Sequence, residues 1–278
     1  MRIKNFASRR RDAAQRAAHE ANMRLKHFLH ARFWRGHGVH SPFVYHVVRH
    51  VITGRHRDAT LRNAANTYKE KLLDDRTEIT VPSIGAIVRQ PRQRKVREIA
   101  QQTATSEKYG RLLARLAADM KPNGILELGT SLGVSTAYMA LARPNTKIIT
   151  IEGVEQIADI ARRHLHEAGF KNVSVLCGDI DATLDEAINA LPEARVEMAF
   201  IDANHCYDAT MRYFRALAAR RADRCLLVFD DIFWSDEMTR AWREITADPD
   251  VMTTIELPRM GLAFFRRGCS KEHYAVRW

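Results

Sequence analysis

From Gly124 onward, short apolar runs alternate with amphipathic stretches, and this alternation restricts the fold more than any other feature of the chain. Five apolar runs have the length of buried strands, at residues 125–128, 147–151, 173–176, 196–201 and 225–229. Helical patterns fill the spaces between and after them, at about 134–142, 155–168, 182–190, 208–219 and 235–246. Strands and helices in strict alternation need crossover connections, which build a parallel sheet covered on both faces. We therefore expect a doubly wound α/β domain.

The end of the chain breaks this alternation. Residues 252–257 and 262–266 are strand-like runs joined only by Pro258-Arg259-Met260-Gly261. So short a link permits a hairpin and hence an antiparallel pair. The sequence therefore predicts one sheet of seven strands, the last of them antiparallel.

The first strand of this region leads into a glycine-containing loop, Glu127-Leu128-Gly129-Thr130-Ser131-Leu132-Gly133-Val134-Ser135. Gly129 and Gly133 allow a tight turn and a close approach to a ligand, and the helix that follows presents free N–H groups. Ser131 and Val134 occupy the second and third glycine positions of the dinucleotide fingerprint. This departure argues against a nicotinamide cofactor, and against the alternative of a non-catalytic nucleotide-binding Rossmann protein.

Acidic residues stand at or near the end of each of the first five strands: Glu127, Glu152, Asp179, Asp202 and the pair Asp230-Asp231. Ligands of open α/β sheets bind at the carboxyl ends of the strands. A single aspartate there could merely cap a helix. An acid on every strand indicates a ligand site.

Residues 124–135 resemble the first motif of class I S-adenosylmethionine-dependent methyltransferases, with Glu152 matching their ribose acid and Asp179 their adenine-side acid. The chain is more closely similar to the cation-dependent O-methyltransferases of the caffeoyl-CoA and catechol type. That likeness rests on Asp202-Ala203-Asn204-His205-Cys206-Tyr207 and Asp230-Asp231-Ile232-Phe233-Trp234, and covers about residues 105–267. It implies a Rossmann-like sheet of order 3-2-1-4-5-7-6.

The resemblance, together with the loop, predicts the site residues. The cofactor S-adenosylmethionine is expected to bind Glu127, Gly129, Thr130, Ser131, Gly133, Ser135, Glu152, Gly153, Asp179, Ile180 and Asp202. A divalent cation such as Mg²⁺ is expected on Asp202, Asp230 and Asp231, because carboxylate oxygens suit a hard cation. Asp202 and His205 are the predicted catalytic residues, with His205 as general base.

Asp231 departs from the family pattern, which usually has Asn at this position. A third carboxylate is compatible with a cation. The alternative is that Asp230 and Asp231 act as a helix cap and a substrate acid without any metal. The expected reaction is O-methylation of a small hydroxylated substrate.

The positive charge of the chain is concentrated near its start. Residues 1–60 hold 13 Lys and Arg against 3 Asp and Glu, whereas the remainder holds 31 against 30. We expect a helical, basic extension over residues 1–104 and a methyltransferase domain over residues 105–278, with Tyr109 and the loop 81–95 as candidates for a lid over the substrate. An alternative function is methylation of RNA, with residues 1–60 holding phosphates.

Location and assembly follow from weaker signals. The four cysteines form no CxxC pair, and no apolar run is long enough to span a membrane. We expect a cytoplasmic protein, and the family resemblance favours a homodimer.

Overall fold

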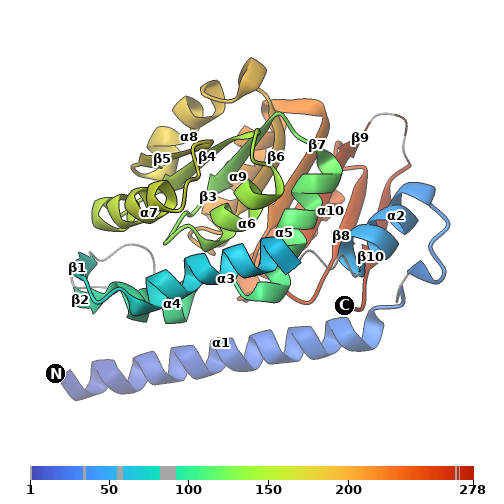
Figure 1. Ribbon diagram of the computed structural model, residues 1–278. Coiled ribbons are helices and arrows are strands. Elements are labelled where there is room, and N and C mark those ends of the chain that lie inside the picture. Colours follow the sequence, from blue (N-terminus) through green and yellow to red (C-terminus); the bar gives the residue numbers. More distant parts are fainter. Residues whose placement is uncertain (1, 34–35, 55–58, 82–91, 267, 269) are drawn as a thin grey trace.

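The computed structural model describes residues 2–33, 36–54, 59–81, 92–266, 268 and 270–278. Its centre is an eight-stranded sheet flanked by helices (Figure 1). The strands are β3 (Gly124–Leu128), β4 (Lys147–Glu152), β5 (Val173–Cys177), β6 (Val196–Ile201), β7 (Arg221–Phe229), β8 (Thr253–Glu256), β9 (Gly261–Arg266) and β10 (Glu272–Ala275). They lie in the order β10-β8-β9-β7-β6-β3-β4-β5, and β9 runs antiparallel to both of its neighbours.

The seven predicted strands therefore have the expected order 3-2-1-4-5-7-6, with the last antiparallel. The count of seven is corrected to eight, because β10 adds to the outer edge parallel to β8. Residues 272–275 contain no continuous apolar run. Their strand forms through pairing, with Glu272 N–H donating to Met252 O at 2.8 Å and Val276 N–H to Glu256 O at 2.9 Å.

Helices cover both faces of the sheet, as the alternation predicts. They are α6 (Val134–Ala142), α7 (Glu155–Glu167), α8 (Ile180–Asn189), α9 (Tyr207–Ala219) and α10 (Asp236–Ala247), with a short 3₁₀ turn, η3 (Pro192–Ala194), before β6. Neighbouring residues of a strand point to opposite faces. Leu126 and Leu128 accordingly pack in the cluster that contains α8, α9 and α10, whereas Ile125 packs with α5 and α6 on the other face.

The N-terminal part comprises α1 (Arg2–His30), α2 (Pro42–His46), the π-helical turn η2 (Val47–Ile52), α3 (Ala59–Asp74), the strands β1 (Glu78–Val81) and β2 (Arg92–Lys95), α4 (Val96–Thr103) and α5 (Glu107–Met120). The expected loop over 81–95 begins and ends in these two strands, which form an antiparallel ribbon. Residues 82–91 lie outside the described part. None of the helices in the described ranges is long and apolar enough to cross a membrane.

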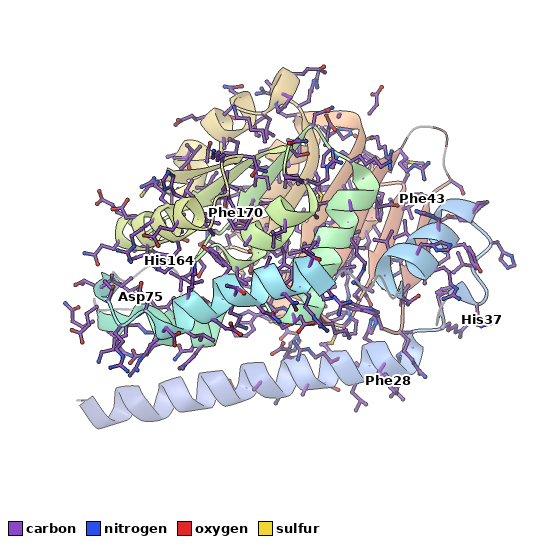
Figure 2. The ribbon with its side chains drawn as sticks, viewed as in Figure 1. Phe28, His37, Phe43, Asp75, His164 and Phe170 are labelled. Carbon is purple, nitrogen blue, oxygen red and sulfur yellow. The ribbon has the colours of Figure 1, made fainter. Side chains whose placement is uncertain are left out.

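Much of this N-terminal part shares the hydrophobic core of the sheet. Val47, Val51 and other side chains of η2 lie in one cluster with the strands, and Phe43 packs edge-on against Phe264 at 5.1 Å between ring centroids (Figure 2). Helix α1 runs along one side of the body (Figure 1). Its His27 hydrogen-bonds to Glu256 at 3.0 Å and to the carbonyl oxygen of Val276 at 3.1 Å. The boundary between residues 104 and 105 stays a prediction.

Asp75, directly after α3, joins the N-terminal helices to α7. Its carboxylate lies 2.9 Å from Nε2 of His164 and 3.0 Å from Nη2 of Arg163, and it accepts the Thr77 N–H at 2.8 Å (Figure 2). Burial opposes ionisation, but hydrogen bonds from Thr77 and His164 outweigh it and lower the pKa of Asp75 to about 2. The pair therefore stabilises the fold above about pH 4, and this contribution is lost as the pH falls towards 2.

We expect Asp75→Asn to lower the free energy of unfolding by about 1 kcal/mol at neutral pH, a value discounted for solvent screening. Urea unfolding measured at about pH 7 and about pH 2.5 should show the difference from the wild type shrinking at the lower pH. Asp74→Asn, at the exposed neighbouring position, is the control. An Asp75→Asn difference that stays constant with pH would contradict this account.

Candidate active site

The loop after β3 rests on a buried carboxylate. Glu127 is 0% exposed and accepts hydrogen bonds from the hydroxyls of Ser135 at 2.6 Å, Thr136, and Thr150 at 2.7 Å. Burial raises the pKa of Glu127, and these hydroxyls partly oppose the rise. Thr130 extends the chain of hydroxyls, 2.6 Å from Thr150. The structure thus places the predicted residues Glu127 and Ser135 beneath the loop, where they hold its shape.

Both glycines of the loop are required by their surroundings. Gly129 has a φ of +96°, and a Cβ there would overlap the carbonyl oxygen of Asp202. Gly133 has a φ of +76°, and its Cβ would lie 3.0 Å from Oη of Tyr68. Tyr68, on α3, donates its hydroxyl to the carbonyl oxygen of Leu132 at 2.8 Å. Nothing in the sequence around Tyr68 predicts this contact.

Glu152 joins the ends of β3 and β4. One of its oxygens accepts the Ser131 N–H at 2.8 Å, and the other accepts the Val154 N–H at 2.9 Å. Burial raises the pKa of Glu152, whereas the backbone N–H groups of Val154, Ser131 and Gly153 lower it. The carboxylate is held in one orientation beside the loop, at the position expected for an acceptor of ribose hydroxyls.

Asp179 stands at the end of β5 and caps α8. Its carboxylate accepts the Asp181 N–H at 2.9 Å, and the following Ile180 is buried as the first residue of the helix. The observed contact of Asp179 is therefore that of a helix cap. An added contact with the adenine side of a cofactor stays a prediction.

A small cavity opens beside the loop. It is lined by Thr103, Ala104, Thr105, Gly129, Thr130, Ser131, Leu132, Val134, Ser135 and Asp202. Thr103, at the end of α4, lies 2.9 Å from Ser131 between their hydroxyl oxygens. Five predicted cofactor residues thus share one cavity, and residues 103–105 are an addition that the sequence did not indicate.

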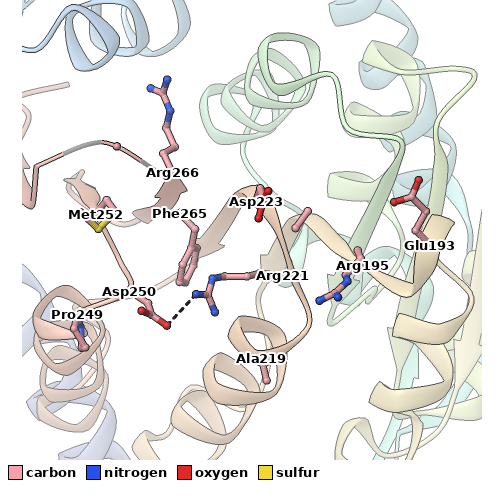
Figure 3. Close-up of a pocket in the computed structure, with 12 residues that line it drawn as sticks. Glu193, Arg195, Ala219, Arg221, Asp223, Pro249, Asp250, Met252, Phe265 and Arg266 are labelled. Carbon is pink, nitrogen blue, oxygen red and sulfur yellow. Dashed lines mark hydrogen bonds and ion pairs between the residues drawn. The ribbon is translucent and has the colours of Figure 1, made fainter.

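Two larger cavities lie elsewhere. One is at the amino ends of β6 and β7, where Arg221 pairs with Asp250 at 2.9 Å (Figure 3). The other lies between η2 and α5 and is lined by His46, Arg115 and their neighbours. The small cavity is instead lined by Asp202 and by Ser131, whose N–H donates to Glu152, so we place the candidate active site there despite its size.

The structure brings Asp202, His205 and Asp231 together. Nε2 of His205 lies 3.4 Å from Oδ1 of Asp202, and one ligand atom from each of the three residues lies within 4.8 Å of the others. Asp230, predicted as a metal ligand, is outside this group. It is 1% exposed and engages Arg259 through both oxygens, at 2.8 Å from Nε and 2.6 Å from Nη2.

Arg259 is the most important site residue that the sequence analysis missed. It lies in the link between β8 and β9, which the sequence identifies only as a turn. Its Nε also lies 2.9 Å from Oδ1 of Asp231. Its side chain approaches the cluster because β9 lies beside β7, which places this link next to the end of β7.

The cluster carries more negative than positive charge. Burial and repulsion by Asp230 and Asp231 raise the pKa of Asp202 well above its usual value. Burial and Asp230 raise the pKa of Asp231 to about 7. Burial lowers the pKa of His205. A bound cation would stabilise the ionised form of these carboxyl groups.

Unusual backbone geometry gathers at the same edge. Ser131, Asn204, His205 and Asp231 are non-glycine residues with φ of 46°, 59°, 38° and 51°. Each such conformation costs of the order of 1–3 kcal/mol and persists only where its surroundings enforce it. These residues follow β3, β6 and β7, so the strain coincides with the converging acids.

Aromatic residues lie around the cluster. Tyr109 lies 5.6 Å from the Arg259 guanidinium, measured to its ring centroid, and 5.2 Å from the Trp278 ring. Burial and the charge of Asp230 raise the pKa of Tyr109 to about 12. The ring of Trp234 lies 6.2 Å from that of His205. Tyr109 is thus at the site, as a lid residue would be.

Comparisons with known proteins find similarity in the same part of the chain. Residues 126–232 match the family described as "Methyltransferase domain". A catechol O-methyltransferase of Niastella koreensis is 34% identical over 108 residues, which is 36% of this chain and 46% of the relative. A protein-L-isoaspartate O-methyltransferase of Methanococcoides burtonii is 41% identical over 63 residues, 22% of this chain and 31% of the relative. The chain thus spans less than half the length of either relative.

Solved structures share the fold over more of the chain. An O-methyltransferase from Bacillus cereus, in complex with SAH, has a TM-score of 0.52 at 19% identity, covering 76% of this chain and 92% of the other. An O-methyltransferase from Streptomyces achromogenes, in complex with SAM, has a TM-score of 0.52 at 22% identity, covering 80% and 95%. These solved structures share the fold of this chain, and residues 126–232 match a methyltransferase domain.

Proposed function

We propose that this protein transfers the methyl group of S-adenosylmethionine to a hydroxyl oxygen of a small molecule. The observation that carries the proposal is the contact between the cofactor loop and the acid cluster, where Gly129 packs directly on the carbonyl of Asp202. A cofactor beside Glu152 would therefore meet an acceptor held near Asp202 and His205. The catechol O-methyltransferase relatives support a hydroxylated acceptor.

The residues of the loop edge fit the cofactor. Glu152 presents an oriented carboxylate for the ribose hydroxyls, and Asp179 with Ile180 would lie on the adenine side. Gly129, Thr130, Ser131 and Gly133 provide the turn, with Gly153 beside Glu152. S-adenosylmethionine supplies an activated methyl group on its sulfonium sulfur. The chain itself orients the acceptor and receives its proton.

His205 is proposed as the proton acceptor. Its ring is mostly buried between Asp202 and Trp234, and burial favours the neutral form that can accept a proton. Asp202 lies 3.4 Å away and would stabilise the imidazolium that forms. Tyr109 and Trp278 would exclude water from the acceptor.

A divalent cation would be held by the carboxylates of Asp202 and Asp231. Magnesium usually binds one or two protein carboxylates and keeps several waters, so two carboxylates are sufficient. Bound there, the cation supplies Lewis acidity to the acceptor oxygen. This set differs from the predicted one, because Asp230 is paired with Arg259.

A methyl-transfer screen with labelled S-adenosylmethionine tests this function. We expect transfer to molecules with two neighbouring hydroxyls, loss of that transfer in chelator, and recovery on adding Mg²⁺. Full activity in chelator would contradict the metal, and failure to bind S-adenosylmethionine would contradict the function itself. Including RNA in the screen tests the sequence-based alternative through residues 1–60.

The cytoplasmic location, the homodimer and the RNA contact stay predictions of the sequence. Sedimentation of the intact chain would test the homodimer. RNA binding that falls steeply with salt, and that is lost on deleting residues 1–32, would support the RNA contact.

A further inference from the structure

We propose that Arg259 sets the charge of the acid cluster, keeping Asp230 out of the metal-binding set and leaving a site that one divalent cation neutralises. This inference rests on the proposed function. Arg259 would act as a positioning residue, through Asp230 and Asp231, without touching the substrate.

The contacts of Asp230 are the first step. Its carboxylate accepts two guanidinium hydrogen bonds from Arg259 and the backbone N–H of Asp231 at 2.9 Å. A two-point Arg–carboxylate pair has a fixed geometry and is among the stronger hydrogen-bonded pairs. With both oxygens engaged and 1% exposure, Asp230 has no free oxygen directed at a cation.

Charge balance is the second step. With all three carboxylates ionised, Asp202, Asp230 and Asp231 against the guanidinium of Arg259 leave a formal charge of −2. Glu20 and Arg24 of α1 form an ion pair with each other, so together they add no net formal charge. A divalent cation would therefore bring the cluster to neutrality.

The shielding of Arg259 is the third step. Its guanidinium lies 5.6 Å from the Tyr109 ring centroid, and its side chain is 28% exposed. Removing a charge from such a partly buried network leaves its partner uncompensated. Asp230 would then carry an unpaired charge next to Asp202 and would compete for the cation.

Exchanging the charged pair for a neutral one tests the proposal. Arg259→Gln changes the formal charge to −3, Asp230→Asn changes it to −1, and the double variant restores −2 with an amide facing an amide. We expect Arg259→Gln to lower kcat/KM by about 100-fold, and the double variant to recover to within about tenfold of the wild type. Arg259→Lys keeps the charge but loses the two-point pairing, so its kcat/KM should lie between those of Arg259→Gln and the double variant.

Binding of Mn²⁺, followed by electron paramagnetic resonance, gives a readout that is independent of activity. We expect Asp230→Asn to bind Mn²⁺ about tenfold more weakly than the wild type, and the double variant to bind it within about threefold of the wild type. If Asp230 is instead a metal ligand, the double variant will lose Mn²⁺ as well as activity. That result would overturn the proposal, as would purely additive effects of the two substitutions.

Arg221→Gln is the matched control. Arg221 also pairs with an aspartate, Asp250, and also lies against an aromatic ring, 5.0 Å from the centroid of Phe265, but at the opposite edge of the sheet (Figure 3). It should leave Mn²⁺ binding unchanged. If the wild type binds neither S-adenosylmethionine nor Mn²⁺, the proposed function is contradicted. If the wild type binds both, but the variants show no coupling between positions 230 and 259, only this inference is contradicted.

Discussion

Replacing Glu152 with alanine is expected to weaken S-adenosylmethionine binding by about 100-fold or more. A hydrogen bond to a charged acceptor contributes about 1.5–3 kcal/mol, and losing two of them from the ribose corresponds to at least about two orders of magnitude in Kd. The substitution also removes the acceptor for the Ser131 and Val154 N–H groups, so the loop itself loses a support. Titration calorimetry with the intact protein measures the effect.

Two variants make the Glu152 result specific. Glu152→Gln keeps the shape and one acceptor oxygen, and should weaken binding by only about tenfold. Glu155→Ala removes an exposed carboxylate three residues later and should leave Kd unchanged. An unaltered Kd in a folded Glu152→Ala protein would show that the cofactor lies elsewhere.

Replacing Asp202 with asparagine is expected to lower kcat by about 10²–10³, with a smaller change in the Kd of S-adenosylmethionine. The substitution keeps the size of the side chain and the backbone that packs on Gly129. It removes the carboxyl group that lies 3.4 Å from His205 and is proposed to hold the cation. The loss should therefore appear in the chemical step.

Single-turnover measurements separate chemistry from binding for this variant. Asp208→Asn, on the exposed first turn of α9, is the control and should retain wild-type kcat. If Asp202→Asn kept its kcat and lost only cofactor affinity, the residue would belong to the cofactor site and not to catalysis.

Local pattern determined much of the fold. The strands β3, β4 and β6 are largely buried and read as nearly continuous apolar runs, so periodicity located them and the helices that follow them to within a few residues. The strand β10 was not predicted, because its residues are stabilised by pairing with β8 and have no apolar pattern of their own. The strands β1 and β2 were also not predicted, because each has only four residues and β2 is entirely polar.

The candidate site also has features that the sequence predicted and features that it did not. Glu152, Asp202 and Asp231 stand at strand ends, and the parallel topology alone predicts that they meet at one edge. Which of them face one another depends on backbone turns with positive φ and on partners distant in sequence. Asp230 and Asp231 are adjacent in the chain, yet the first is buried against Arg259 and the second groups with Asp202 and His205.

The amino-acid pattern alone predicts a doubly wound sheet with a glycine-containing loop and acids along its carboxyl edge. The pairing of Arg259 with Asp230, the support of the loop by Tyr68 and the position of Tyr109 next to Arg259 and Trp278 appear only in the folded structure. The physical reason is the range of the interactions. Strand and helix periodicity is written within a few neighbouring residues, whereas a buried charge finds its partner only after strands from distant parts of the chain have paired.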